Sequence, residues 1–148
     1  MMTEHSVEID APPDAVWDIY ADVERWPEWT ASVDRVVPLD GPGLAVGKRF
    51  EIKQPRFPTL VWAVTSVDPG ASWTWRQHSP GGTTLATHEV EALGPDRTVV
   101  RQRIDQRGPI GVVVGLLTRR LTRRYLGMEA DGLKARAEES RRRNGASA

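Results

Sequence analysis

The sequence of 148 residues contains no cysteine. Disulfide bonds and thiolate chemistry are therefore excluded, and one of the two commonest zinc ligands is missing. Only three histidines are present, His5, His78 and His88, and their spacing matches no zinc-binding motif. We therefore expect neither a metal nor a cofactor.

The sequence also lacks a long hydrophobic run. Its most apolar stretch, residues 108–117, is far shorter than a membrane span and leads directly into Arg119 and Arg120. The first residues have neither the basic start nor the apolar core of a signal peptide. These absences predict a soluble, cytoplasmic protein with no membrane span. A phosphate-binding glycine loop and a nucleophile-elbow serine are missing as well.

The charges are balanced overall but unevenly placed. Residues 1–100 carry 8 Lys or Arg and 15 Asp or Glu, a net charge of −7, whereas residues 101–148 carry 12 and 5, a net charge of +7. We favour a solvated basic helix face, and an acidic partner or a membrane surface is the alternative. Nucleic-acid binding is disfavoured, because aromatic residues do not alternate with these arginines.

The size and composition are those of one globular domain, with 39% hydrophobic and 27% charged residues. No linker or internal repeat divides the chain. We expect a single domain over residues 1–143 and a disordered tail over residues 144–148. The sequence does not predict an oligomeric state.

The first third of the chain reads as a strand followed by two short helices. Residues 6–10 alternate polar and apolar side chains, as strands do, and two prolines stop this strand. A helix is predicted from there to about residue 23, since proline suits the first helical turn. Pro27 separates it from a short second helix, and the neighbouring Trp26 is expected to be partly exposed.

The middle of the chain reads as a series of strands, for a total of about six or seven. The predicted strands cover residues 33–39, 49–53, 60–67, 72–78, 83–93 and 98–107. The turn at residues 79–82 predicts a hairpin that pairs His78 with Thr83. By the same register Trp73 pairs with His88 and Trp75 with Ala86, so these residues share one face, which we interpret as the concave one.

From residue 110 onward the period of the apolar residues becomes helical. One apolar stripe is formed by Ile110, Val114, Leu117, Leu121, Tyr125 and Met128. Strands in succession followed by one long helix indicate an α+β fold, in which a curved antiparallel sheet wraps around that helix. Such a sheet can enclose an apolar cavity.

This pattern resembles the START-like (SRPBCC) superfamily, in particular its polyketide cyclase/dehydrase and lipid transport group. The resemblance rests on residues 9–17 (IDAPPDAVW), 26–29 (WPEW), 43–47 (GLAVG), 87–91 (THEVE) and the helix over 108–133. It implies a helix-grip fold with a deep hydrophobic pocket. It does not carry a catalytic set over to this sequence, because the superfamily hosts many functions.

The candidate site residues are those expected to face the pocket. His88 is the candidate for a catalytic or ligand-orienting role, because burial would favour a neutral imidazole that both donates and accepts hydrogen bonds. Gln102 is polar between apolar neighbours on an inward face, and it could also pair with His88. The other predicted ligand contacts are Trp62, Trp75, Leu117, Leu121 and Tyr125. For the tryptophans and His88 we favour a structural role in the core.

Three functions are compatible with this sequence. The first is binding of a small hydrophobic or aromatic ligand, of the polyketide, lipid or isoprenoid type, in an internal pocket. The second is a polyketide cyclase or dehydratase that uses His88 as general base, which would need a second ionisable group nearby. The third is an interaction protein that docks an acidic partner through its basic C-terminal helix.

Overall fold

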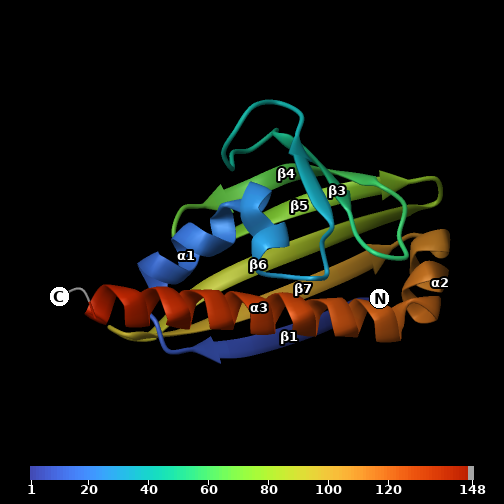
Figure 1. Ribbon diagram of the computed structural model, residues 1–148. Helices are drawn as coiled ribbons and strands as arrows, with labels where there is room; N and C mark the ends of the chain where they lie inside the picture. Colours follow the sequence, from blue (N-terminus) through green and yellow to red (C-terminus); the bar gives the residue numbers. More distant parts are fainter. Residues whose placement is uncertain (147–148) are drawn as a thin grey trace.

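The computed structural model describes residues 1–146, which form seven strands and four helical segments joined by loops (Figure 1). The strands are β1 Met2–Ile9, β2 Arg35–Pro38, β3 Arg49–Lys53, β4 Leu60–Asp68, β5 Ser72–Ser79, β6 Gly82–Gly94 and β7 Arg97–Arg107. The helical segments are α1 Pro13–Ala21, the 3-10 helix η1 Val23–Glu28, α2 Pro109–Leu117 and α3 Arg119–Ala146. The predicted α+β architecture is thereby confirmed.

The strands form one antiparallel sheet in the order β1-β7-β6-β5-β4-β3-β2. From β2 to β7 each strand pairs with the next one along the chain, and β1 closes the series beside β7. The β5–β6 hairpin has the predicted register, with Trp73 opposite His88 and Trp75 opposite Ala86. The register shift of β4 lies opposite Trp75 and Thr74, and that of β6 lies near the end of the strand, so neither interrupts the β5–β6 ladder that pairs these residues. The predicted phase of His88 is therefore correct.

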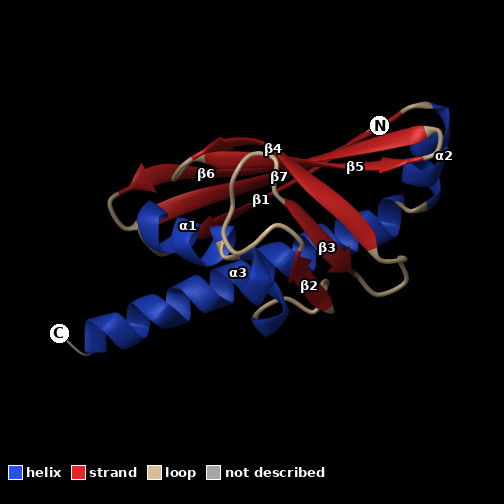
Figure 2. Cartoon of the chain, turned by 90° about the horizontal axis from the view of Figure 1, so that it is seen from above, coloured by secondary structure: helices blue, strands red, loops and turns tan. Residues whose placement is uncertain are grey.

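Helix α3 crosses the concave side of the sheet, as the views in Figures 1 and 2 both show. Its buried stripe includes Leu126, Ala130, Leu133 and Ala137. At Gly132 the helix comes so close to the end of η1 that an added Cβ would overlap the carbonyl oxygen of Trp29. The missing side chain is what allows helix and loop to touch here.

The long helix predicted from Ile110 onward is in fact two helices, α2 and α3, which break at Thr118. Gly111 and Gly115 are buried, whereas the aliphatic residues of α2 are exposed. The reason is close backbone packing, since a Cβ on Gly82 at the β5–β6 turn would lie only 2.8 Å from the backbone nitrogen of Gly111. Packing through glycine turns the apolar face of α2 outward, which a periodicity argument does not foresee.

The end of the chain also differs from the prediction. Residues 144–146 continue α3, where a disordered tail was expected from residue 144, and residues 147–148 lie outside the described residues. Arg143 pairs with Glu139 one turn earlier at 2.5 Å, an arrangement that supports the helix this far.

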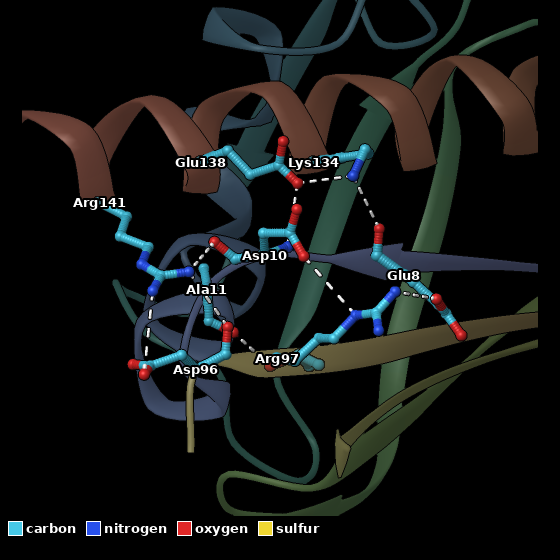
Figure 3. A network of polar contacts seen from close by, with 9 residues as sticks. Glu8, Asp10, Ala11, Asp96, Arg97, Lys134, Glu138 and Arg141 are labelled. Atoms are coloured by element: carbon cyan, nitrogen blue, oxygen red, sulfur yellow. Dashed lines mark hydrogen bonds and ion pairs between the residues drawn. The ribbon is translucent and has the colours of Figure 1, made fainter. Parts of the chain in front are cut away.

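The second half of α3 is held to the start of the sheet by a polar network, which we call the clamp (Figure 3). Glu138 accepts a hydrogen bond from the backbone N–H of Asp10 over 3.0 Å and pairs with Lys134 at 2.6 Å. Arg141 donates to the carbonyl of Asp10 over 2.9 Å and lies 3.9 Å from a carboxylate oxygen of Asp96. Backbone groups at the end of β1 thus find partners on α3.

Candidate functional site

A cavity of about 280 Å³ lies between the concave side of the sheet and α3. Its apolar wall includes Trp26, Val33, Ile52, Leu60, Trp62, Trp75, Ile104 and Leu126. Its polar wall includes Gln77, His88, Gln102, Gln106, Tyr125 and Glu129. Mostly apolar walls with a few converging polar groups are typical of a small-molecule site.

The aromatic residues around the cavity form a connected cluster. Trp75 lies with its ring centroid 5.6 Å from that of Trp26 and 5.9 Å from that of Trp62. Trp73, which is fully buried behind them, stacks on His88 with the two centroids 4.1 Å apart. Flat, rigid side chains therefore surround the imidazole and offer a large contact area to a ligand.

His88 is buried and uncharged. Burial in this aromatic environment lowers the pKa of His88 to about 3, against an ordinary value of 6.5. Its Nδ1 lies 3.4 Å from the carbonyl oxygen of Trp73, an acceptor, so Nδ1 carries the proton. The other ring nitrogen, Nε2, is then left as a hydrogen-bond acceptor.

Glu129 enters the same cavity from α3. Tyr20 of α1 donates to Glu129 Oε2 over 3.2 Å, and Gln102 Nε2 of β7 donates to the same oxygen. Burial raises the pKa of Glu129 to about 8, so the carboxyl is largely protonated at neutral pH. Tyr20 is also fully buried, and this burial, with Glu129 beside it, raises the pKa of its phenol.

Gln102 links the two ionisable groups. It is the cross-strand partner of His88 in the β6–β7 register, and its amide reaches Glu129. Its Oε1 is buried and has no partner within the described residues. Because Gln102 and Tyr20 both donate to Oε2 of Glu129, the proton of the neutral acid belongs on its other oxygen, Oε1. The contact with Gln102 is thus compatible with a protonated Glu129.

Five of the seven predicted site residues line the cavity, namely Trp62, Trp75, His88, Gln102 and Tyr125. Tyr125 also donates a hydrogen bond to the carbonyl of Pro55. Leu117 and Leu121 do not line it. Leu117 is 82% exposed, because the break at Thr118 takes it out of the stripe that faces the sheet.

Sequence reasoning missed Glu129, Tyr20 and Trp26. Trp26 was expected to be partly exposed, but it is buried and donates through Nε1 to the carbonyl of Tyr20 over 2.8 Å. Glu129 follows Tyr125 by four residues and is therefore on the same face of α3. A carboxylate at that spacing within an otherwise apolar stripe is the signal that would have found it.

Residues 1–146 contain neither a metal-ligating cluster nor a helix that could span a membrane. No three His, Asp or Glu side chains in this part of the chain come together as a metal site would require. No helix there is long and apolar enough to cross a membrane.

The sheet order, the gripping helix and the cavity between them define a START-like helix-grip protein. Residues 2–138 match the family model described as polyketide cyclase/dehydrase and lipid transport, and the chain belongs to this family. The resemblance inferred from the sequence motifs is therefore confirmed.

The chain is also similar to individual proteins. A protein of Streptomyces halstedii named "Putative polyketide cyclase" is 30% identical over 115 residues, which cover 76% of this chain and 94% of that protein. Among solved structures, the Zhui aromatase/cyclase from Streptomyces sp. R1128 has a TM-score of 0.73 at 19% identity, with 93% of each chain covered. Norcoclaurine synthase from Thalictrum flavum has a TM-score of 0.75 at 17% identity, covering 95% of this chain and 96% of its own. At these identities the structures establish the shared fold alone.

Proposed function

We propose that the protein binds a small hydrophobic or aromatic molecule of the polyketide, lipid or isoprenoid type in this cavity. The observation that carries the proposal is the combination of an aromatic wall with His88, Gln102 and Glu129, all buried and converging on one space. The match to a family that includes lipid transport supports it. The absence of cysteine suits a role in the cytoplasm.

The affinity would come mainly from the apolar wall. Each Å² of apolar ligand surface that leaves water contributes about 25 cal/mol. The contribution of the tryptophans is enlarged by their rigidity, because flat rings lose little conformational freedom when a ligand packs on them. An aromatic wall of this kind therefore favours a ligand with a flat carbon skeleton.

The polar groups would orient the ligand and restrict its charge. His88 offers an acceptor at Nε2, and the neutral carboxyl of Glu129 offers a donor. A hydroxyl and a carbonyl on the ligand would satisfy this pair. Within the described chain, the one cation that lines the cavity, Arg103, is already paired with Glu4. A charged ligand would therefore lose its hydration without gaining an unpaired opposite charge, so an uncharged ligand is favoured.

The test compares His88→Ala with His78→Ala. His78 is exposed on the β5–β6 hairpin and does not line the cavity, so its replacement controls for the loss of an imidazole. Native mass spectrometry of the protein from its own host would identify a small molecule released on denaturation. Quenching of tryptophan fluorescence would then give the affinity, which we expect to fall about tenfold or more in H88A only. Equal affinities of a folded H88A and H78A would refute the orienting role.

A second function, dehydration or cyclisation of a polyketide-like substrate, is favoured by Glu129. A carboxyl with a raised pKa is able both to give and to take a proton near neutral pH. Glu129 would protonate a departing β-hydroxyl, so that the C–O bond breaks and water leaves. The resulting carboxylate would then take the proton from the neighbouring carbon, the C=C bond would form, and the acid would be restored.

In this second function His88 would position the substrate carbonyl or hydroxyl, and it would not be the base. Its lowered pKa makes it a weak proton acceptor at neutral pH. The discriminating variant is Glu129→Gln, which keeps the shape and the hydrogen-bonding capacity but removes the acid. If a substrate is found, E129Q should bind it and turn it over at least a hundredfold more slowly. Unchanged turnover would exclude Glu129 from the chemistry.

A further inference from the structure

Helix α2 exposes an apolar surface that the fold leaves uncovered. Its exposed aliphatic residues are Ile110, Val112, Val113, Val114, Leu116 and Leu117, six of the eleven large hydrophobic residues that are exposed in the described chain. Leu117 is 82% exposed and Leu116 60%. Such a concentration on nine residues goes beyond the scattered apolar residues of an ordinary surface.

This surface continues directly into a cluster of cations. Arg119, Arg120, Arg123 and Arg124 occupy the first turns of α3, and all four are exposed. Among the residues that the structure describes, none of the four has a hydrogen bond or an ion pair through its side chain. No Asp or Glu occurs between Asp105 and Glu129, so no acidic residue of this segment neutralises them.

The shape of the apolar surface distinguishes between possible occupants. At 100° per residue, the six aliphatic positions of α2 cover an arc of roughly 200°. Gly111 and Gly115 occupy the opposite side and pack on the protein. A helix that docks into a groove of another protein presents a narrow stripe, whereas a wide aliphatic arc flanked by arginines suits the interface of a membrane.

We propose that α2 and the first turns of α3 form a docking surface for the surface of an anionic lipid bilayer. The aliphatic arc of α2 would enter the boundary between headgroups and acyl chains, and the four arginines would pair with anionic headgroups. In Figures 1 and 2, α2 lies at one end of the molecule beside the start of α3, where a flat surface can approach it. The protein would associate with the bilayer without spanning it.

The docking surface borders the rim of the cavity. Ile110 and Val114 of α2 line the cavity, as does Thr122 of α3. If the cavity binds a hydrophobic ligand as proposed above, the ligand could pass between cavity and bilayer with little exposure to water. Vesicle binding itself does not require an occupied cavity, so the two proposals can fail separately.

The experiment is co-sedimentation of the full chain with vesicles. Vesicles of phosphatidylcholine alone are compared with vesicles that contain 30% phosphatidylglycerol, at low and high salt. We expect binding to the anionic vesicles only, and weaker binding at high salt because the arginines are screened. Absence of binding to anionic vesicles, or equal binding to both kinds, would overturn the proposal.

Two pairs of matched variants separate the charged and apolar contributions. R123Q/R124Q should weaken binding about 30-fold, since each arginine near an anionic surface contributes about 1 kcal/mol. R76Q/R142Q, which removes the same charge from exposed arginines elsewhere, should have little effect. L116Q/L117Q should weaken binding about tenfold or more, whereas V46Q/L93Q should not. If R123Q/R124Q lost no more vesicle binding than R76Q/R142Q, and L116Q/L117Q no more than V46Q/L93Q, the proposal would be overturned.

A labelling experiment does not depend on the folding of these double variants. The chain has no cysteine, so Leu117→Cys and Val46→Cys each create one labelling site for a polarity-sensitive fluorophore. Anionic vesicles should shift the emission to the blue at position 117 and leave it unchanged at position 46. The remaining possible occupant is a second copy of this chain, and light scattering of the free protein tests for it. If the protein is a dimer that L116Q/L117Q dissociates, and if it does not bind vesicles, the surface is a dimer interface and the proposal is overturned.

Discussion

The two ends of helix α3 differ in their contacts with the rest of the protein. In its second half, Lys134, Glu138 and Arg141 each bond to the backbone at the end of β1, and Leu133 is fully buried. At its start, together with α2, the aliphatic residues face outward and four arginines have no acidic partner within the described residues. One helical region therefore serves two purposes, since its second half stabilises the fold and its start carries the proposed docking surface.

The sharpest test of this comparison replaces one leucine at each end of the region. Leu133→Ala should lower the free energy of unfolding by about 2 to 5 kcal/mol, because a fully buried side chain leaves a cavity. Leu117→Ala should change it by less than about 0.5 kcal/mol, because the side chain is 82% exposed. Urea denaturation measures both. A loss above 1 kcal/mol in L117A would mean that α2 contributes to the core.

Two glycines of α3 differ in their surroundings, so replacing each by alanine compares a tightly packed position with an open one in the same helix. Gly132→Ala should destabilise the protein by about 1 to 3 kcal/mol, because the new methyl group meets the backbone of Trp29. Gly127→Ala should stabilise it by up to about 1 kcal/mol, since nothing lies within 4 Å of the added Cβ and alanine is the better helix former. Thermal melting distinguishes the two. A neutral G132A would show that the contact with Trp29 is easily relaxed.

Glu129 and His88 are both buried and ionisable, and together they should set how the free energy of unfolding depends on pH. Glu129 has a folded pKa above its ordinary 4.5, so its contribution to stability is lost as the pH rises from 4.5 through about 8. His88 has a folded pKa below its ordinary 6.5, so its contribution is lost as the pH falls from 6.5 through about 3. Between pH 4.5 and 6.5 the two trends oppose each other, and the wild type should show little change.

Glu129→Gln should expose the trend that belongs to His88. The variant should gain stability from pH 3 to 6.5, with a slope of up to about 1.4 kcal/mol per pH unit, and stay level from 6.5 to 8, where the wild type declines. Denaturation at a series of pH values measures this. Parallel curves for the wild type and E129Q would contradict the neutral, buried state of Glu129.

The smallest expected effect concerns single arginines. Arg141→Ala should lower the free energy of unfolding by about 0.5 to 1 kcal/mol, because it loses hydrogen bonds to the carbonyls of Asp10 and Asp96 at a partly exposed site. Arg123→Ala removes no such contact and should be neutral. Chemical denaturation at low and high salt would check both. Equal effects would erase the distinction between the two ends.

Much of the fold could be predicted because strand positions depend on local patterns. The hairpin register that places His88 opposite Trp73 followed from its turn and from alternation. The outward orientation of the aliphatic face of α2 could not be predicted, because it depends on how Gly111 packs on Gly82, a contact between distant segments. The same contact decides that Leu117 points to solvent.

The candidate site was predictable to the extent that it lies on strands. His88, Gln102 and Trp75 were found from the phase of their strands, and Tyr125 from the helical stripe. Glu129 and Tyr20 were missed because a carboxyl and a phenol on two separate helices gain meaning only when the fold brings them within 3.2 Å of each other. Pairing across elements is information that no local pattern contains.

The α+β class, the family, the strand register around His88 and the concentration of arginines in the last third of the chain could all be read from the sequence. These features follow from side-chain periodicity, turn residues and composition, which are local properties of the chain. The burial of Glu129 beside Tyr20, the outward aliphatic face of α2 and the pairing of individual arginines became visible only in the folded chain. These features depend on close contacts between segments far apart in sequence, where burial sets the charge state of an acid and a glycine decides which face of a helix meets the core.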